Sequence, residues 1–250
     1  LFNGHDFKFL THLINHCEND PSYHVKMDYI PGHEMSHRKE SMKLLDRADL
    51  IFCEWALGNA EWYSHNKKPD QRLVIRLHHQ ELGLDYLNRI KWQNVDQIIF
   101  ICPENMEIFL RRFPHMSSRT SLVYNVIDCD ALDQEKLPGA QFNLGFIGTS
   151  PMRKAPHLGL DIFEQLKKSD DRFVLYFKGK HPWEYRWLWR KDEERSYYTE
   201  LYKRIENSLY CNSIVFDPHG NDIPEWFTKI GFILSTSDHE GSHQAVAEGM

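Results

Sequence analysis

The stretch FNLGFIGTSPMRKAPHLGLDIFEQLKK, residues 142–168, contains one complete pattern of strand, turn and helix. Residues 142–147 are mainly apolar and include aromatic and branched side chains, which predicts a buried strand. Residues 157–168 place apolar side chains at helical spacing, which predicts an amphipathic helix. Two adjacent cations lie in the turn between them. This order indicates a βα unit of a mostly parallel sheet.

The same alternation continues along the whole chain. Further strands are predicted at residues 23–29, 50–53, 73–77, 97–102, 173–177, 213–216 and 232–235. Helices are predicted at residues 6–17, 35–48, 59–65, 85–91, 104–113, 197–209 and 223–229. Residues 128–139 contain acidic residues, Pro138 and Gly139, which suits a linker. We therefore predict an α/β protein with two Rossmann-like domains, residues 1–130 and 131–250, facing a cleft at the carboxyl ends of their strands.

Composition narrows the class of protein. The 30 Lys and Arg residues against 36 Asp and Glu residues give a formal charge of −6, so no overall basic field attracts nucleic acid. The five cysteines form no Cys-x-x-Cys pair, which favours reduced thiols and a cytoplasmic location. No apolar run approaches the roughly 20 residues of a membrane helix. A peripheral association with the inner face of a membrane is compatible with this sequence.

The last residues, STSDHEGSHQAVAEGM at 235–250, run from an apolar strand through a polar turn into a helical pattern. Because this pattern ends without a cap or a breaker, we expect the second domain to be truncated at its C-terminal end. Glu240 and Glu248 are separated by seven residues, or about 12 Å along a helix. Two carboxylates at that separation suit an extended ligand with hydroxyl groups. The spacing alone also fits a first-turn residue and a solvated helix residue.

This stretch resembles the Glu-x7-Glu motif of retaining GT-B glycosyltransferases of family 4, in the form Ser-x-x-Glu-Gly…Glu-Gly-Met. The resemblance implies that Glu240 is a catalytic residue near the sugar of a nucleotide-sugar donor. It also implies that Glu248 holds the ribose and that Ser242 belongs to the donor site.

The segment GFIGTSPMRK, residues 145–154, resembles the phosphate loop of the same family. Arg153 and Lys154 would neutralise the departing diphosphate, because adjacent cations stabilise a charge that develops on a leaving group. Thr149 and Ala155 depart from the family, which often has Arg and Gly at these positions. A solvated basic pair in a loop is the simpler alternative.

Three further residues follow predicted strands. His78 ends the segment RLVIRLHH (residues 72–79) together with His79, and the resemblance places a histidine there that faces the donor sugar. Gly4 follows the first strand-like residues, where glycine permits close approach of a ligand. Lys180 lies in a loop that we expect to meet the nucleoside. A capping histidine and ordinary turn chemistry explain the same residues equally well.

The resemblance implies a metal-independent, retaining hexosyl-type glycosyltransferase that uses a UDP- or GDP-sugar as substrate and needs no cofactor. Its acceptor would be a glycan, a lipid-linked molecule or another hydroxyl compound, and glycan or surface polysaccharide synthesis is the expected role. A sugar-nucleotide epimerase or phosphorylase on the same fold is an alternative. A non-catalytic nucleotide-sugar-binding scaffold domain is another.

Two motifs lie outside this scheme. Residues 33–37, HEMSH, match the His-Glu-x-x-His pattern of zinc proteases, but polar residues flank them and we predict no metal site. The aromatic run WEYRWLWR, residues 183–190, fits a sugar-stacking surface, a patch for a partner, or core beneath a long loop.

Overall fold

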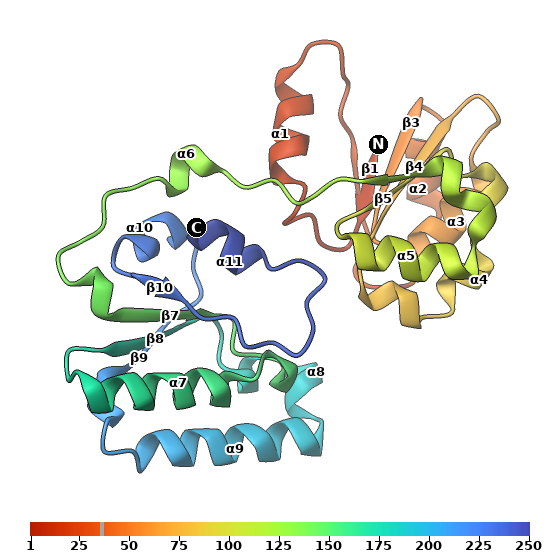
Figure 1. The fold of residues 1–250 in the computed structure, drawn as a ribbon. Coiled ribbons are helices and arrows are strands. Elements are labelled where there is room, and N and C mark those ends of the chain that lie inside the picture. The colour runs from red at the N-terminus through yellow and green to blue at the C-terminus, as the bar shows by residue number, and fades with distance from the viewer. Residues whose placement is uncertain (36–37) are drawn as a thin grey trace. The chain divides into compact units, whose positions relative to one another are not determined.

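The computed structural model describes residues 1–35 and 38–250. The chain divides into two compact units, Leu1–Val126 and Ile127–Met250, so the division lies a few residues before the predicted boundary at residue 130. Each unit has its own parallel sheet and its own hydrophobic core (Figure 1). The predicted α/β fold class is confirmed.

Unit 1 is built on a six-stranded sheet with the order β2-β1-β3-β4-β5-β6, and every strand pair is parallel. The strands are β1 (Phe2–Gly4), β2 (Met27–Tyr29), β3 (Leu50–Glu54), β4 (Arg72–Leu77), β5 (Gln97–Phe100) and β6 (Thr120–Leu122). The helices are α1 (Thr11–Asn19), α2 (Arg38–Leu45), α3 (Gly58–Asn66), α4 (Tyr86–Arg89) and α5 (Pro103–Arg112), with 3-10 turns η1 (Gln80–Gly83), η2 (Trp92–Asn94) and η3 (Pro114–Arg119).

Both faces of this sheet are covered, which explains the apolar strands. Alternate residues of β3 and β4, such as Ile51 and Ile75, pack with residues of α2 to α5 in the larger core. Their neighbours, such as Phe52 and Val74, pack on the other face against Ile14 of α1. Figure 1 shows α1 on one side of the sheet and α3 to α5 on the other.

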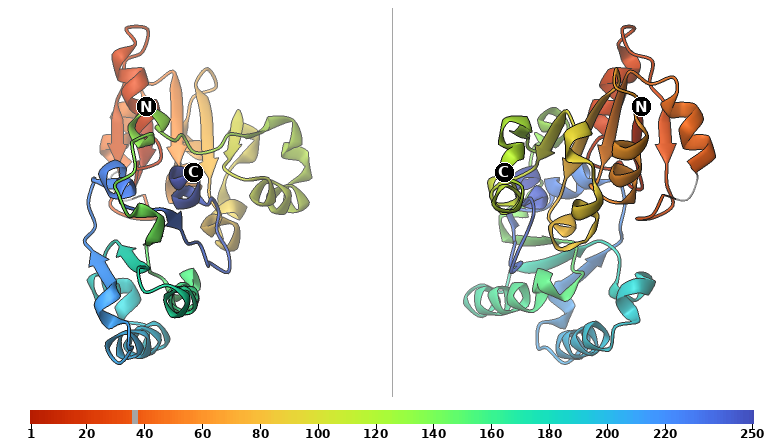
Figure 2. Two further views of the ribbon diagram at one scale, coloured as in Figure 1. Left: turned by 60° about the vertical axis from the view of Figure 1, so that its left-hand side comes forward. Right: turned by 90° about the vertical axis from the view of Figure 1, so that its right-hand side faces the viewer.

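Unit 2 has a four-stranded parallel sheet with the order β10-β7-β8-β9, whose strands are labelled in Figure 1. Figure 2 shows the ribbon from two further directions. The strands are β7 (Asn143–Ile147), β8 (Val174–Lys178), β9 (Ile214–Asp217) and β10 (Phe232–Ile233). The helices are α6 (Cys129–Leu132), α7 (Pro156–Ser169), α8 (Arg186–Trp189), α9 (Asp192–Glu206), α10 (Ile223–Thr228) and α11 (Gln244–Gly249), with 3-10 turns η4 (Ala140–Phe142), η5 (Met152–Lys154), η6 (Pro182–Glu184) and η7 (Cys211–Ser213).

The second sheet is also covered on both faces. Leu144 and Phe146 of β7 pack with α7, α8 and α9, whereas Ile147 lies on the other face with Trp226 of α10. Gly145 of β7 allows this packing, because a Cβ there would lie 2.6 Å from the Trp226 ring.

Some predicted bounds are wrong at the ends of elements. Helix α9 begins at Asp192 and not at residue 197, and its first turn contains three acidic residues, which favour a helix N-terminus. Strand β6 was missed because its three residues are half-buried and form no apolar run. The aromatic run is partly core: Leu188 is buried, whereas Trp183 and Trp187 are exposed.

Candidate functional site

Strand order locates one candidate site in each unit. In an open parallel sheet, ligands bind beyond the carboxyl ends of the strands, where neighbouring connections leave in opposite directions. In unit 2 this point lies between β7 and β10, and in unit 1 between β1 and β3. The loops that follow these four strands therefore form the two candidate sites.

In unit 2, the loop after β10 packs on the loop after β7. The Thr236 hydroxyl donates to the carbonyl oxygens of Lys154 (3.0 Å) and Ala155 (2.8 Å). The backbone N–H of Asp238 donates to the carbonyl of Arg153 at 3.0 Å. These bonds join two segments that are more than 80 residues apart in the sequence.

The charged side chains of these loops meet as a result. The Lys154 ammonium donates to Glu240 Oε1, which also accepts from the Ser237 hydroxyl at 2.7 Å. Arg153 donates to the carbonyl of His239 at 2.6 Å and lies 3.9 Å from Glu240 Oε2. Two cations and one carboxylate leave this group with a net charge of +1. Three residues predicted from the sequence, Arg153, Lys154 and Glu240, therefore lie together in the structure.

The carboxyl group of Glu240 is held in its ionised form. Burial by itself would raise its pKa, but the hydrogen bonds from Lys154 and Ser237 and the nearby charge of Arg153 lower it below its ordinary value. An ionised carboxylate accepts hydrogen bonds only, so Glu240 suits a partner that donates, such as a hydroxyl group.

The backbone of the loop after β7 has a fixed shape. Gly148 has φ +72° and Ala155 has φ +48°, both in the left-handed region. Ala155 is the residue before α7, so the turn places Lys154 next to the helix N-terminus, where the positive end of the helix dipole favours an anion. Helix α9 supports the turn, because Tyr198 donates to the carbonyl of Thr149 at 2.7 Å. Thr149, the residue that departs from the resemblance, thus contributes its backbone to this support.

Three other predicted donor residues have less defined surroundings. Glu248 is half-buried on α11 and accepts from Gln244 at 2.8 Å. Ser242 is half-buried in the loop before α11. Lys180 is exposed, with its ammonium 6.0 Å from the Tyr185 ring.

The better-buried cation of that segment is Lys178, which was not among the residues predicted from the sequence to bind the donor. Its side chain is 3% exposed, and its ammonium lies 2.7 Å from both carboxylate oxygens of Asp222. Successive side chains of a strand point to opposite faces of the sheet. Because Phe177 packs against α7, Lys178 faces the other side of the sheet.

In unit 1, His78 lies at the carboxyl end of β4 and is 5% exposed. Its Nε2 is 2.8 Å from Glu54 Oε1, and its ring stacks on Trp55 with centroids 3.9 Å apart. His79, the alternative, has its Nδ1 3.0 Å from the Asn105 side chain. His78 therefore contacts the end of β3 and the loop that follows it, whereas His79 contacts α5.

Gly4 ends β1 at the same edge. A Cβ on Gly4 would lie 3.0 Å from the Glu54 carbonyl and 3.2 Å from its Cβ. This close approach to β3 is sufficient reason for glycine, and its predicted role in ligand binding stays a prediction.

Three residues of this edge were missed by sequence reasoning. Glu54 and Glu81 are fully buried, and Arg76 is 4% exposed and donates to Glu54 at 2.5 Å. For Glu54 and Arg76 the available signal was a charged residue within an apolar strand, because such a residue stays buried only when it is paired. Glu81 lies in η1 and carried no such signal.

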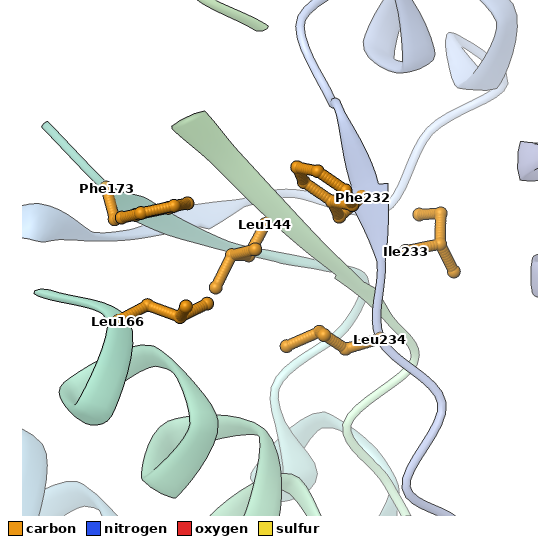
Figure 3. Close-up of a pocket in the computed structure, with 6 residues that line it drawn as sticks. All are labelled: Leu144, Leu166, Phe173, Phe232, Ile233 and Leu234. Carbon is orange, nitrogen blue, oxygen red and sulfur yellow. The ribbon is translucent and has the colours of Figure 1, made fainter. Parts of the chain in front are cut away.

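A different hollow lies elsewhere in unit 2. It has a volume of about 270 Å³, and Figure 3 shows its lining of apolar side chains from α7, β7, β10 and the residue before β8. Its lining residues are Leu144, Leu166, Phe173, Phe232, Ile233 and Leu234. Since it presents no charged group, it is unsuited to a phosphate, and we assign the candidate site to the strand edge instead.

Among residues 1–35 and 38–250, no group of three or more His, Cys, Asp or Glu side chains is placed to hold a metal ion. Residues 36 and 37 of the HEMSH pattern lie outside the described residues. No helix in the described part of the chain has the length and apolar character needed to span a membrane.

No protein-family model and no curated protein sequence matches the chain. Solved structures do. Anabaena HepE in complex with UDP and glucose matches with a TM-score of 0.67 and 14% identity, over 99% of this chain and 77% of HepE. An S. aureus TarM variant in complex with fondaparinux, α-GlcNAc-glycerol and UDP matches with a TM-score of 0.57 and 14% identity, over 83% of this chain. The pneumococcal O-GlcNAc transferase GtfA in complex with UDP and GlcNAc matches with a TM-score of 0.57 and 16% identity, over 85% of this chain.

The fold is accordingly that of GT-B glycosyltransferases. The chain spans about 41% of the length of TarM and 42% of GtfA. Identities of 14–16% support the fold and carry no assignment of activity.

Proposed function

We propose that the chain is a glycosyltransferase that moves a sugar from a nucleotide-sugar donor to an acceptor hydroxyl. In this reaction the bond between the anomeric carbon and the diphosphate breaks, a bond from that carbon to the acceptor oxygen forms, and the acceptor proton is released. The carrying observation is the junction of Arg153, Lys154 and Glu240 at the β7–β10 edge, beside the N-terminus of α7.

The charge of this junction suits a diphosphate. Arg153 and Lys154 exceed Glu240 by one positive charge, and the positive end of the α7 dipole lies beside them. Charge-assisted hydrogen bonds to the leaving group would stabilise it as it departs. We propose UDP as the nucleotide, because HepE, TarM and GtfA were each solved with UDP.

The remaining roles follow the sequence resemblance. Glu240, ionised and able to accept from hydroxyl groups, would orient the donor sugar, and Glu248 and Ser242 would contact the nucleotide. His78 would contact the sugar, and unit 1 would supply most acceptor contacts. Lys180 and Gly4 are proposed as outer contacts of the donor. The proposed enzyme transfers a hexosyl group with retention of configuration and without a metal ion. Its proposed role is glycan or polysaccharide synthesis at the cytoplasmic side of a membrane.

Calorimetry and thermal shift with UDP, GDP, ADP and dTDP and their common sugars test the donor site, first with EDTA and then with Mg²⁺. We expect saturable binding of UDP in EDTA that is weakened by Lys154→Ala and by Glu248→Ala. Glu164→Ala, which removes a carboxylate paired with Arg204 on the surface, serves as the control. If none of the four nucleotides binds, the donor site is wrongly assigned.

The scaffold alternative is favoured by one observation: Lys154 and Glu240 already pair within the chain, as a structural bridge between two loops would. Product analysis separates the two functions. Transfer of sugar from UDP-sugar to an acceptor, lost in Glu240→Gln while UDP still binds, supports the enzyme. Binding of UDP-sugar without transfer or hydrolysis over a panel of acceptors supports the scaffold. Proton NMR of the product linkage then tests retention.

A further inference from the structure

His78 lies within a buried group of charged residues from neighbouring elements of unit 1. Glu54 of β3 has no exposed surface, and its Oε1 lies 2.8 Å from His78 Nε2 and 2.5 Å from Arg76 Nη1. Glu81 of η1 is equally buried and accepts from the backbone N–H groups of His78 (3.1 Å) and Ala56 (3.0 Å). Asn125 accepts from the other arm of Arg76.

The contact between Glu54 and His78 defines where the ring proton lies. An ionised carboxylate has no hydrogen to donate, so the bond at 2.8 Å requires a proton on His78 Nε2. Arg76, which can only donate, lies farther from the same nitrogen, at 3.4 Å, and its Nη1 is already bonded to Glu54. A neutral ring with the proton on Nε2 keeps a lone pair on Nδ1.

The buried group contains one guanidinium, Arg76, and two carboxyl groups, Glu54 and Glu81. Arg76 offsets one of the two buried carboxyl groups, and a second buried negative charge would be costly. Burial raises the pKa of the Glu81 carboxyl, which limits the negative charge that this buried group carries.

Trp55 fixes the plane of the ring. Its indole stacks on His78 at 3.9 Å with 26° between the planes, and its φ of +71° is rare for a residue with a side chain. Such a backbone is strained and persists where surrounding contacts hold it. Here the Trp55 N–H donates to the carbonyl of Arg76 (3.1 Å), and the indole N–H donates to the carbonyl of Asp6 (3.1 Å).

We propose that Glu54 is a positioning residue that holds His78 in the Nε2–H tautomer, so that Nδ1 accepts a hydrogen bond from a hydroxyl group of the bound ligand. Among the described residues, no protein group is hydrogen-bonded to His78 Nδ1. The nature of the ligand, a sugar, rests on the proposed function. The tautomer itself rests on the contacts of unit 1 alone.

Long-range ¹H–¹⁵N NMR of the labelled full chain tests the tautomer, with His78→Asn to assign the ring signals. We expect one protonated nitrogen, Nε2, and one unprotonated nitrogen, Nδ1. In Glu54→Gln the amide can donate as well as accept, so the two nitrogen signals should move toward each other as the tautomers mix. Glu54→Asp keeps a carboxylate and should keep the wild-type pattern.

Glu61→Gln provides the matched control, because Glu61 pairs with Arg89 on the surface of the same unit. Its spectrum should leave the His78 signals unchanged. A proton on Nδ1 in the wild type, or an unaltered pattern in Glu54→Gln, would overturn the proposal. Thermal melts of each variant confirm that the comparison is made on folded protein.

Binding of UDP-glucose and its monodeoxyfluoro analogues supplies the second readout. Fluorine cannot donate, so one analogue should bind about three- to tenfold more weakly to the wild type, and this loss should disappear in His78→Asn. Equal losses in both proteins would overturn the contact. If UDP-glucose does not bind at all while the tautomer is as expected, the proposed function fails and the role of Glu54 in setting the tautomer stands.

Discussion

Replacement of Glu240 by glutamine should tighten the binding of free UDP. Glu240 bonds to Lys154 and lies near Arg153, so its negative charge offsets part of the attraction of these cations for a phosphate. The glutamine side chain has nearly the same shape and no charge. The same substitution should abolish sugar transfer, because the amide is a poorer acceptor for a sugar hydroxyl than a carboxylate.

The size of the effect follows from charge separation. A phosphate oxygen in contact with Lys154 would lie about 6 Å from the carboxylate, where two unit charges repel by about 3 kcal/mol at an effective dielectric constant of about 20. The side chains of Arg153 and Lys154 are 50% and 25% exposed, so solvent weakens this repulsion. About 1 kcal/mol remains, which corresponds to about fivefold tighter binding.

Isothermal titration calorimetry of UDP at low and high salt measures this change. Lys154→Ala should weaken binding about tenfold or more, because it removes a charge-assisted hydrogen bond to phosphate. Glu200→Gln, which changes the same charge at an exposed pair with Lys203, should leave the affinity unchanged. Equal or weaker UDP binding in Glu240→Gln would refute the reasoning, since the carboxylate would then not oppose the anion.

Three further outcomes are expected. Gly145→Ala should lower the melting temperature, because its Cβ would lie 2.6 Å from the Trp226 ring and overpacking costs about 1–3 kcal/mol; an unchanged melt would contradict the packing of β7. The lowered pKa of Glu240 stabilises the folded chain above the unfolded value of about 4.3, and this contribution is lost as pH falls through the folded pKa, so Glu240→Gln should show a shallower decline of melting temperature in acid. Burial raises the pKa of the Cys53 thiol, so mass spectrometry after brief alkylation should find Cys53 unmodified in the native chain and exposed Cys129 labelled, whereas early labelling of Cys53 would indicate local opening.

The donor-side residues could be predicted because parallel sheets concentrate strand ends on one edge. Arg153 and Lys154 follow β7, and Glu240 follows β10, so the adjacency of these two strands is enough to bring the three side chains together. The sequence indicated both strands by their apolar character and both loops by their charges. It could not indicate that Glu240 bonds to Lys154 and only approaches Arg153, because that choice depends on side-chain reach.

The surroundings of His78 could not be predicted from the sequence. His78 was recognisable as a polar residue at the end of a strand, but its partner Glu54 lies on another strand, 24 residues away. Only the parallel register that pairs Glu54 with Arg76 brings the carboxylate to the ring. Lys180 was selected because it lies in a loop, where binding residues are common. Lys178 lies in β8 itself, and its pairing with Asp222 could not be predicted from the sequence.

In both candidate sites a carboxylate controls how a neighbouring basic side chain interacts with a ligand. Glu240 sets how strongly Lys154 attracts an anion, and Glu54 sets which nitrogen of His78 accepts a hydrogen bond. Because these carboxylates follow or end strands whose positions the core fixes, the fold determines the geometry and the carboxylates determine the chemistry. Glu240→Gln should therefore alter ligand preference more than it alters stability, whereas Glu54→Gln also removes the buried partner of Arg76 and should lower the melting temperature.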